Sequence, residues 1–309
     1  MKKFVPDYYN DFACIKGACR HSCCVGWEID IDEDSLCRFR SVPGELGRRL
    51  RESILQNEEG ASFQLTEEER CPFLNCDGLC DLILELGEDC LCQICDDHPR
   101  FRNFIAGREE IGLGLCCEAA CRLILGRKEP VQFIELEDDG LEEEFPEDDA
   151  WLLQLRGQLI SMAQDRRITV EGRIRRMLDF LRLDLKPFEP TGWIDFLLEL
   201  ERLDESWAER LGGMQKPDKF PEWELAFEQL LVYLLMRHLP GALEDDDIAG
   251  HIAYVVFAWE LVRAICAAQE NLDLDGLVEI CRLYSSELEY SDENIDCIID
   301  RLHELNSGI

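Results

Sequence analysis

The second half of the chain carries the apolar repeat of α-helices. In the stretch WLLQLRGQLISMAQ, Leu152, Leu155 and Leu159 recur at spacings of three and four residues, which predicts one helix. RIRRMLDFLRL and WIDFLLELERLDESWAERL predict further helices. EWELAFEQLLVYLLMRHL follows Pro221 and ends at a Pro-Gly pair, which are start and stop signals for another.

The most apolar segment is DDDIAGHIAYVVFAWELVRAICAAQ, which opens with aspartates suited to capping a helix. We expect this helix to be central. It contains a glutamate and an arginine, so no transmembrane span is indicated. Two more helices are expected near 275–287 and 292–305, and no convincing strand alternation occurs after residue 128. Residues 151–309 are therefore expected to form an α-helical bundle domain.

The first part of the chain has short elements and many turn residues. Residues 44–56 and 117–126 favour helices. Few other residues in this part of the chain could form a large sheet. Between the two parts, residues 129–150 are acidic at 11 of 22 positions, which is typical of an exposed linker. We predict a mainly α protein, with an irregular cysteine-rich metal-binding domain at 1–128, an acidic linker at 129–150 and the helical domain.

Cysteine use is concentrated in the first domain. Fourteen of the 17 cysteines lie at or before Cys121. The N-terminus MKKFVPDYYNDF lacks the apolar stretch of a signal peptide, so we expect a cytoplasmic protein, in which structural disulfides are rare. Ligation of a metal by thiolates is therefore favoured over disulfides, while reduced core cysteines stay an alternative.

The spacings do not decide between zinc and an iron–sulfur cluster. Cys92 and Cys95 form a CxxC pair that can curl around one ion. The other spacings are irregular, as iron–sulfur proteins accept, whereas zinc modules often have two regular pairs. No three cysteines have the C-x3-C-x2-C spacing of radical S-adenosylmethionine enzymes.

The formal net charge of −34 restricts the partners. Nucleic acid and anionic membrane surfaces would be repelled, since phosphate binding needs clustered lysine and arginine. A basic or lysine-presenting protein would be attracted.

Four motifs, in order, resemble those of the flagellin lysine-N-methylases, within a wider group that has a CxxCxxCC-type zinc- or iron-chelating domain. They are DFACIKGACRHSCCVGWEIDID, CPFL followed by DGLCDL, LGEDCLCQICDDHPR, and LGLCCEAACRLIL, and the strong match covers residues 8–126. The metal-ligating residues that this resemblance implies are Cys14, Cys19, Cys23, Cys24, Cys71, Cys80, Cys92, Cys95 and Cys116.

The resemblance implies methyl transfer from S-adenosylmethionine to the ε-amine of lysine on flagellin or another lysine-presenting protein, by an enzyme that holds a [4Fe-4S] cluster. Zinc is the alternative metal. The family often has a Ser-Cys-Pro-Glu-Ala stretch where this chain has Leu115-Cys116-Cys117-Glu118-Ala119, so either Cys116 or Cys117 takes that role. No G-x-G-x-x-G motif opens a βαβ unit, so a Rossmann-type methyltransferase site is not visible.

A mechanism follows as a hypothesis. Lysine is almost wholly protonated at neutral pH, so the enzyme must desolvate or deprotonate the amine. The catalytic candidates that could orient the amine are Tyr8, Tyr9 and Glu118, with Asp30 and Asp32 as further carboxylates.

The cofactor-binding candidates are Trp27, Asp30 and Arg100. Trp27 could pack on the adenine or the sulfonium, or be an ordinary core aromatic. Asp30 could instead cap a helix, and Arg100 could instead brace the cluster through backbone carbonyls.

Two other functions stay open at this point. One is a non-enzymatic zinc-binding module whose helical half docks a partner. The other is an iron–sulfur protein for electron transfer or sensing.

Overall fold

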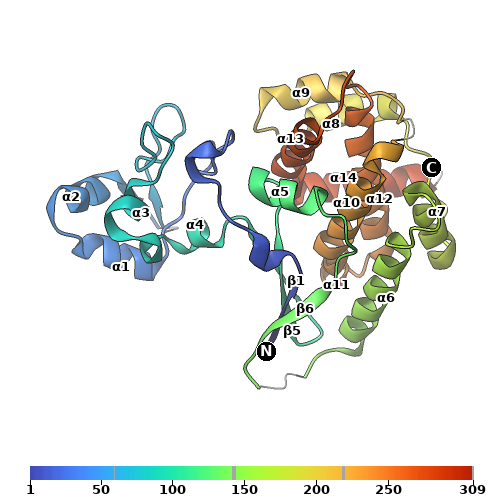
Figure 1. Ribbon diagram of the computed structural model, residues 1–309, viewed down its shortest axis with the longest axis horizontal. Helices are drawn as coiled ribbons and strands as arrows, with labels where there is room; N and C mark the ends of the chain where they lie inside the picture. The colour runs from blue at the N-terminus through green and yellow to red at the C-terminus, as the bar shows by residue number, and fades with distance from the viewer. Residues whose placement is uncertain (59, 141–143, 218–219, 308–309) are drawn as a thin grey trace. The chain divides into compact units, whose positions relative to one another are not determined.

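Helices dominate the structure, and a small sheet accompanies them (Figure 1). The expectation of a mainly α protein is thereby confirmed. The computed structural model describes residues 1–58, 60–140, 144–217 and 220–307. Residues 141–143 of the predicted linker, and the last two residues of the predicted helical domain, lie outside this part.

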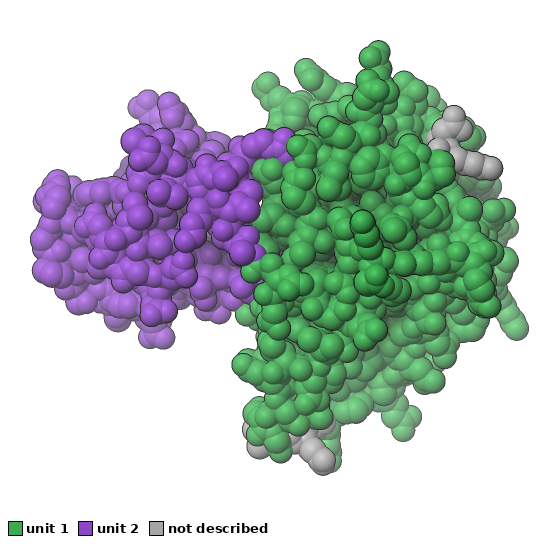
Figure 2. Space-filling model, in the orientation of Figure 1, with its two compact units in different colours: residues 1–12, 101–309 green, residues 13–100 purple. Residues whose placement is uncertain are grey.

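The chain forms two compact units (Figure 2). Unit 2 consists of residues 13–100, and unit 1 consists of residues 1–12 together with 101–309. Both sequence-predicted boundaries, at 128 and 150, therefore fall inside unit 1. The difference arises because the first strand of the chain pairs with strands that come a hundred residues later.

The sheet of unit 1 has the strand order β4-β5-β1-β6. β1 is parallel to β5, with Lys2 opposite Arg108, and antiparallel to β6, with Lys2 opposite Asp138. A two-residue turn at Ala106 and Gly107, both with positive φ, joins β4 to β5, as tight hairpins require. The strands are β1 (Lys2–Pro6), β4 (Arg100–Ile105), β5 (Arg108–Leu113) and β6 (Phe133–Asp138).

β6 corrects the prediction that no strand follows residue 128, because it lies inside the predicted acidic linker. Its carboxylates meet the lysines of β1: Lys2 Nζ is 3.0 Å from Glu135, and Lys3 Nζ is 2.8 Å from Glu137. Pairing with a distant basic strand therefore orders a segment whose own charges favour an extended, solvated chain.

The helices expected in the second half are present. A π-helical turn, η7 (Ser285–Glu289), follows α13 directly. The helices are α5 (Glu118–Leu125), α6 (Glu147–Ala163), α7 (Val170–Leu181), α8 (Ile194–Glu199), α9 (Glu205–Gly212), α10 (Glu224–His238), α11 (Ala242–Asp245), α12 (Ile248–Cys266), α13 (Leu274–Tyr284) and α14 (Asp292–Ser307).

The most apolar helix, α12, is central in unit 1, as its sequence predicts. Asp247 caps it by accepting a hydrogen bond from the Gly250 N–H at 2.9 Å. Tyr254 and Trp259 are fully enclosed, and α12 packs against α10, α13 and α14. Within the described part of the chain, α12 is the helix long and apolar enough to cross a bilayer, but its burial is that of a core helix.

Unit 2 folds around a smaller core that includes Phe39, Leu50 and Phe73. Three cysteines are also buried in this core, and a domain of this size has little apolar area with which to stabilise itself. Its elements are α1 (Glu33–Ser41), α2 (Gly44–Ser53), β2 (Ile54–Gln56), β3 (Ala61–Phe63), α3 (Asp81–Leu86) and α4 (Gln93–Asp97).

Candidate functional site

Five of the cysteines assigned to a metal gather at the core of unit 2. Cys71 and Cys92 are buried in it, and Cys24, Cys80 and Cys95 pack against it. The Cys71 N–H donates to the Cys24 carbonyl at 2.8 Å, which joins the first cysteine motif to the second. Cys92 Sγ lies 3.4 Å from Cys95 Sγ across the first turn of α4. Three distant motifs therefore meet at one core.

The thiols of this group influence each other's protonation. A hydrogen bond from the Cys23 thiol lowers the pKa of Cys24 to about 7. The Cys95 thiol lowers the pKa of Cys92 in the same way. Burial raises the pKa of Cys71 to about 12, and neighbouring thiols add to the rise. The lowered pKa values of Cys24 and Cys92 favour the thiolate, which is the form that ligates metals, and a bound cation would help to ionise the other thiols.

The donor set suits a soft metal centre, because thiolates select zinc or iron–sulfur clusters. Within the described ranges, no three His, Cys, Asp or Glu side chains already stand close enough together to hold a single metal ion. A zinc ion needs all of its thiolates about 2.3 Å away. A four-iron cluster likewise takes cysteine thiolates, one at each iron, so the donor set suits either centre.

The other predicted ligands are placed differently. Cys14 and Cys23 are exposed near the start of unit 2. Cys19 is half-buried, and its Sγ lies 3.2 Å from the His21 carbonyl oxygen. Cys116 belongs to unit 1.

The structure holds Trp27 beside the cysteine group. Its indole N–H donates to the Cys23 carbonyl, and its ring centre lies 5.6 Å from that of His98. The ring is only partly buried, so one face stays accessible. Asp30 is exposed, and its backbone forms a β-bridge with Ser62.

Asp32, rather than Asp30, caps α1. Its carboxylate accepts from the Ser35 N–H and from the Gln93 N–H, both at 2.8 Å, and so ties α1 to the residue after Cys92. Arg100 donates to the Asp96 carbonyl of α4 at 2.9 Å, and both of its predicted roles, in cofactor binding and in bracing a cluster, stay predictions.

The three catalytic candidates lie in unit 1. Tyr8 is buried in its core, with Arg127 beside the ring, and Tyr9 packs partly buried against the same core. Glu118 is buried at the start of α5, 3.9 Å from Arg122. Packing and ion pairing account for these positions, and a role in methyl transfer stays a prediction.

Sequence reasoning missed a buried polar network centred on Glu289. Its carboxylate is fully enclosed. It accepts a hydrogen bond from the Tyr233 hydroxyl at 2.7 Å, and His238 Nε2 lies 2.7 Å from its other oxygen. Arg237 donates to its backbone carbonyl at 3.1 Å. Burial would raise the pKa of Glu289, but Arg237 and His238 outweigh it and hold that pKa below its usual range.

Tyr290 connects this network to the surface. Its side chain is 48% exposed, and its hydroxyl oxygen lies 3.1 Å from Cys116 Sγ. The guanidinium of Arg237 sits between two rings, 4.8 Å from the centre of Tyr290 and 4.7 Å from that of Phe101. Glu289, Arg237, Tyr290 and Cys116 thus form a continuous path from a buried charge to solvent.

The π-helical turn explains both this placement and why the sequence concealed it. The turn adds a residue to the α-helical register and so rotates Glu289 inward, toward α10. In the sequence, SSELEY looks like the solvated end of a helix. The available signal was an Arg-His pair at the end of an otherwise apolar α10.

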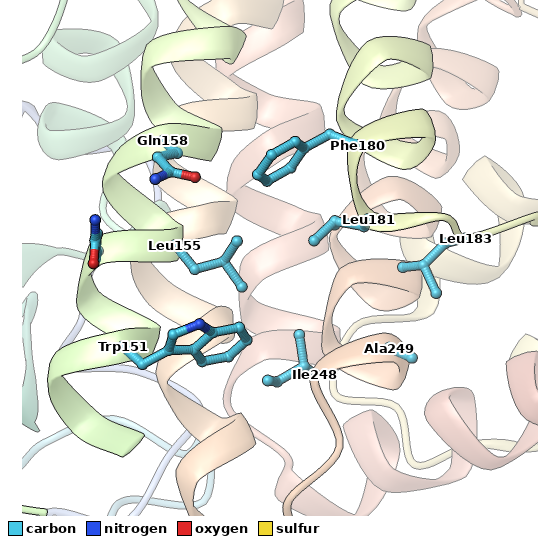
Figure 3. Close-up of a pocket in the computed structure, with 9 residues that line it drawn as sticks. Trp151, Leu155, Gln158, Phe180, Leu181, Leu183, Ile248 and Ala249 are labelled. Carbon is cyan, nitrogen blue, oxygen red and sulfur yellow. The ribbon is translucent and has the colours of Figure 1, made fainter. Parts of the chain in front are cut away.

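Unit 1 also has a hollow of about 530 Å³ between α6, α7 and the start of α12 (Figure 3). Trp151 and Phe180 project toward it from opposite walls, and Leu155, Leu181 and Ile248 complete its apolar lining. It contains none of the predicted site residues.

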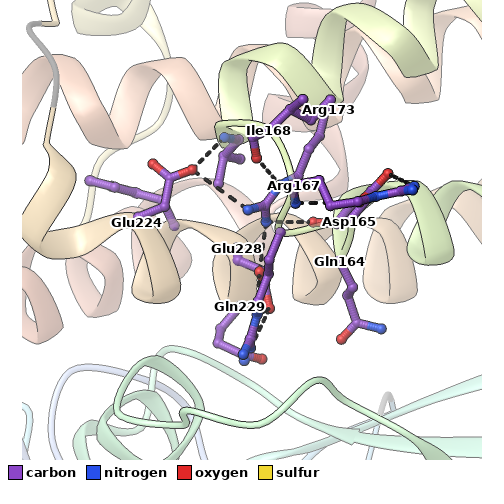
Figure 4. A network of polar contacts seen from close by, with 12 residues as sticks. Gln164, Asp165, Arg167, Ile168, Arg173, Glu224, Glu228 and Gln229 are labelled. Atoms are coloured by element: carbon purple, nitrogen blue, oxygen red, sulfur yellow. Dashed lines mark hydrogen bonds and ion pairs between the residues drawn. The ribbon is translucent and has the colours of Figure 1, made fainter.

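A second buried ion-pair network joins α6, α7 and α10 (Figure 4). Glu228, fully enclosed, is 2.6 Å from Arg173 and 2.8 Å from Arg166. Arg173 also donates to the Ala163 carbonyl. All partners come from the scaffold, so this network is structural.

Comparison with known proteins gives a family match. The model of the FliB lysine N-methylase C-terminal domain matches residues 132–308, more than half of the chain. Tyr233, Arg237, His238, Glu289 and Tyr290 all lie in this range. No solved structure matches the chain.

Curated relatives agree with the family match. The lysine-N-methylases of Salmonella choleraesuis (strain SC-B67) and Salmonella typhimurium (strain LT2) are each 25% identical over 126 residues, which is 39% of this chain and 31% of each relative. The flagellar biosynthetic protein FliU of Salmonella muenchen is 25% identical over 126 residues, 75% of its length. The match thus spans about a third of the first two relatives.

Proposed function

Because the chain belongs to the FliB lysine N-methylase family, we propose that it methylates lysine side chains of flagellin with S-adenosylmethionine as methyl donor. The family match over residues 132–308 is the observation that carries this proposal. The relatives, two lysine-N-methylases and a flagellar biosynthetic protein, support the reaction and the substrate. We place the reaction in the cytoplasm, where reducing conditions keep thiols free.

The proton of the lysine sets the chemical problem. The amine must lose it to solvent water before its lone pair can attack the methyl carbon; the N–C bond then forms as the C–S bond of the sulfonium breaks and the neutral thioether leaves. The acidic surface attracts the cationic side chain before this step. Placing the amine in an apolar, partly closed site then lowers its pKa by desolvation.

We assign the orientation of the amine to Tyr290. It is the part of the Glu289 network that reaches solvent, and its hydroxyl can accept a hydrogen bond from an amine N–H. Arg237 and Cys116 hold its ring and its hydroxyl, and Glu289 holds Arg237. A fixed acceptor of this kind aligns the lone pair with the methyl group, and such alignment supplies much of an enzyme's rate.

We further propose that unit 2 holds a [4Fe-4S] cluster through three of the five grouped cysteines, Cys24, Cys71, Cys80, Cys92 and Cys95, which would leave one iron without a cysteine ligand. When bound, the cluster would supply an iron site able to anchor the amino-acid end of the methyl donor. Trp27 and Arg100 are retained as cofactor-side residues, because both lie beside the cysteine motifs. Asp32 keeps the start of α4, and with it Cys92, in place.

The test is anaerobic purification of the full chain, followed by an optical spectrum and by iron, sulfide and zinc analysis. The protein is then incubated with flagellin and S-adenosylmethionine, and lysine methylation is read by mass spectrometry. A brown protein that adds methyl groups to flagellin lysines supports both proposals.

Other outcomes separate the proposals. A colourless protein with stoichiometric zinc, which gains no iron on anaerobic reconstitution, removes the cluster and favours a zinc-binding interaction module. A brown protein that binds no S-adenosylmethionine and methylates no lysine favours electron transfer or sensing instead.

A further inference from the structure

The hollow between α6, α7 and α12 is built as a surface for contact rather than as core. Its two large aromatic residues stay open to solvent, Trp151 at 52% exposure and Phe180 at 48%. On the same helix α6, Leu152 and Leu159 are buried in the core of unit 1. α6 is therefore apolar on two faces, and only one of them is covered within the described chain.

Figure 3 shows Trp151 and Phe180 projecting from different helices toward the same space, with Ile248 at its lower edge. Gln154 and Gln158 add two amide groups along the α6 wall. Side-chain amides both donate and accept, so they can pair with the backbone of an extended polypeptide.

Exposed aspartates stand close in sequence to the residues that line the hollow. Asp148 lies one helical turn before Trp151, Asp179 directly precedes Phe180, Asp184 follows the α7 wall, and Asp246 comes just before α12. The nearest basic residues in sequence are Arg176, which pairs with Asp165, Arg182 at the end of α7, and Lys186. The surroundings are thus net acidic, and they match a cation.

We propose that this hollow, the α6–α7 groove, docks a lysine-rich segment of the protein substrate. The inference rests on the proposed function, in which the substrate is a lysine-presenting protein. A lysine side chain matches the groove in both of its parts. Its four methylenes pack on Trp151 and Phe180, while its ammonium is attracted by the aromatic faces and the flanking carboxylates.

The first test is independent of methylation. A short fluorescein-labelled peptide, in which lysines alternate with apolar residues, is titrated with the full-length protein, and its anisotropy is followed. We expect Trp151→Ala with Phe180→Ala to weaken binding about tenfold, the usual effect of removing aromatic anchors. Phe104→Ala is the matched control, because Phe104 is 63% exposed on β4, and it should leave the affinity unchanged.

Charge is tested in the same titration. Asp179→Asn should weaken binding and reduce its salt dependence, whereas Asp34→Asn, an exposed aspartate of unit 2, should change both less. Equal effects of the two would mean that net charge alone attracts the peptide, and this would overturn the groove.

The second test uses flagellin as substrate. The double aromatic variant should raise KM for flagellin and leave kcat nearly unchanged, because docking is remote from the reacting amine. If the wild type binds the peptide through the groove but methylates no flagellin, the proposed function fails while the docking site stands. If the aromatic substitutions change neither the peptide affinity nor KM, the docking site is excluded while the proposed function stands.

Two other occupants are distinguished by direct readouts. Sedimentation of a wild-type dimer that the aromatic changes convert to a monomer would assign the groove to a second copy of the chain. Loss of S-adenosylmethionine binding in the same variant would assign it to the methyl donor. Either result overturns the proposal.

Discussion

Glu289 and Glu228 allow function to be separated from stability. Both carboxylates are fully enclosed in unit 1, and both neutralise buried arginines. Glu228 pairs with Arg173, whose side chain is 2% exposed, and Glu289 pairs with Arg237, at 11%. Changing either glutamate to glutamine therefore removes the same charge from a similar setting.

The expected loss of stability follows from the uncompensated cation. Removing one partner of a buried pair costs about 3–5 kcal/mol. In a unit the size of unit 1, each kcal/mol lowers the melting temperature by about 2–4 °C, so both variants should melt roughly 6–20 °C lower. The amide keeps part of the hydrogen bonding, which favours the lower half of that interval.

The assay compares methylation of flagellin at a temperature where circular dichroism shows both variants folded. Glu289→Gln should lower kcat about tenfold, because Arg237 keeps its bond to the backbone carbonyl but loses the carboxylate 3.8 Å from its Nε, and so holds Tyr290 less firmly. Glu228→Gln should keep near wild-type kcat. Tyr290→Phe checks the same role with little change in stability. Equal kcat for Glu289→Gln and Glu228→Gln, or full activity of Tyr290→Phe, would refute the assignment of the amine to this network.

Three further outcomes are expected. Cys92→Ser should lower the iron content after anaerobic reconstitution, while Cys37→Ser, at an exposed position outside the group, should not; equal iron in both would exclude Cys92 as a ligand. Gly112→Ala should destabilise unit 1 by about 1–3 kcal/mol, because a Cβ would stand 2.2 Å from the ring of Phe101, and an unchanged melting temperature would contradict this contact. Burial lowers the pKa of His98 to about 4, whereas an unfolded histidine titrates near 6.5. Between these pH values the unfolded state binds the extra proton, so the unfolding free energy of unit 2 should fall as pH drops from about 6.5 to about 4. In His98→Gln the denaturant midpoint of unfolding should therefore depend less on pH. The same pH dependence of the midpoint in His98→Gln and in the wild type would count against a buried, neutral imidazole.

The hydrophobic pattern of the sequence predicted the helices, whose formation depends on residues close together in the chain. The apolar repeats of α10 and α12 specify helices and burial without reference to the rest of the chain, and both were found. β6 was missed because its acidic residues are ordered by Lys2 and Lys3, which are more than a hundred residues away. The predicted boundary at 128 placed β1 and β6 in different domains for the same reason.

The candidate sites show the same difference between features set by neighbouring residues and features set by distant ones. Cysteine spacing can show that Cys92 and Cys95 share a helical turn, but not that Cys24 meets Cys71, which depends on how two loops fold. The Glu289 network depends on one extra residue in a helical turn. No periodicity in the sequence registers such a shift, because it changes the face of a side chain and not its identity.

The strand order of the sheet also determines the order in which the two units can fold during synthesis. β1 leaves the ribosome before the other strands of the sheet, and its parallel partner β5 is about a hundred residues behind, so at the usual rate of roughly 5–20 residues per second β1 waits about 5–20 s for it. All of unit 2 emerges during that interval and can collapse before unit 1 has its first complete strand pair. A nascent chain whose residues 1–100 have left the ribosome would therefore carry a structured cysteine-rich unit together with an unpaired, lysine-bearing strand, a stage at which metal loading can precede completion of the helical unit.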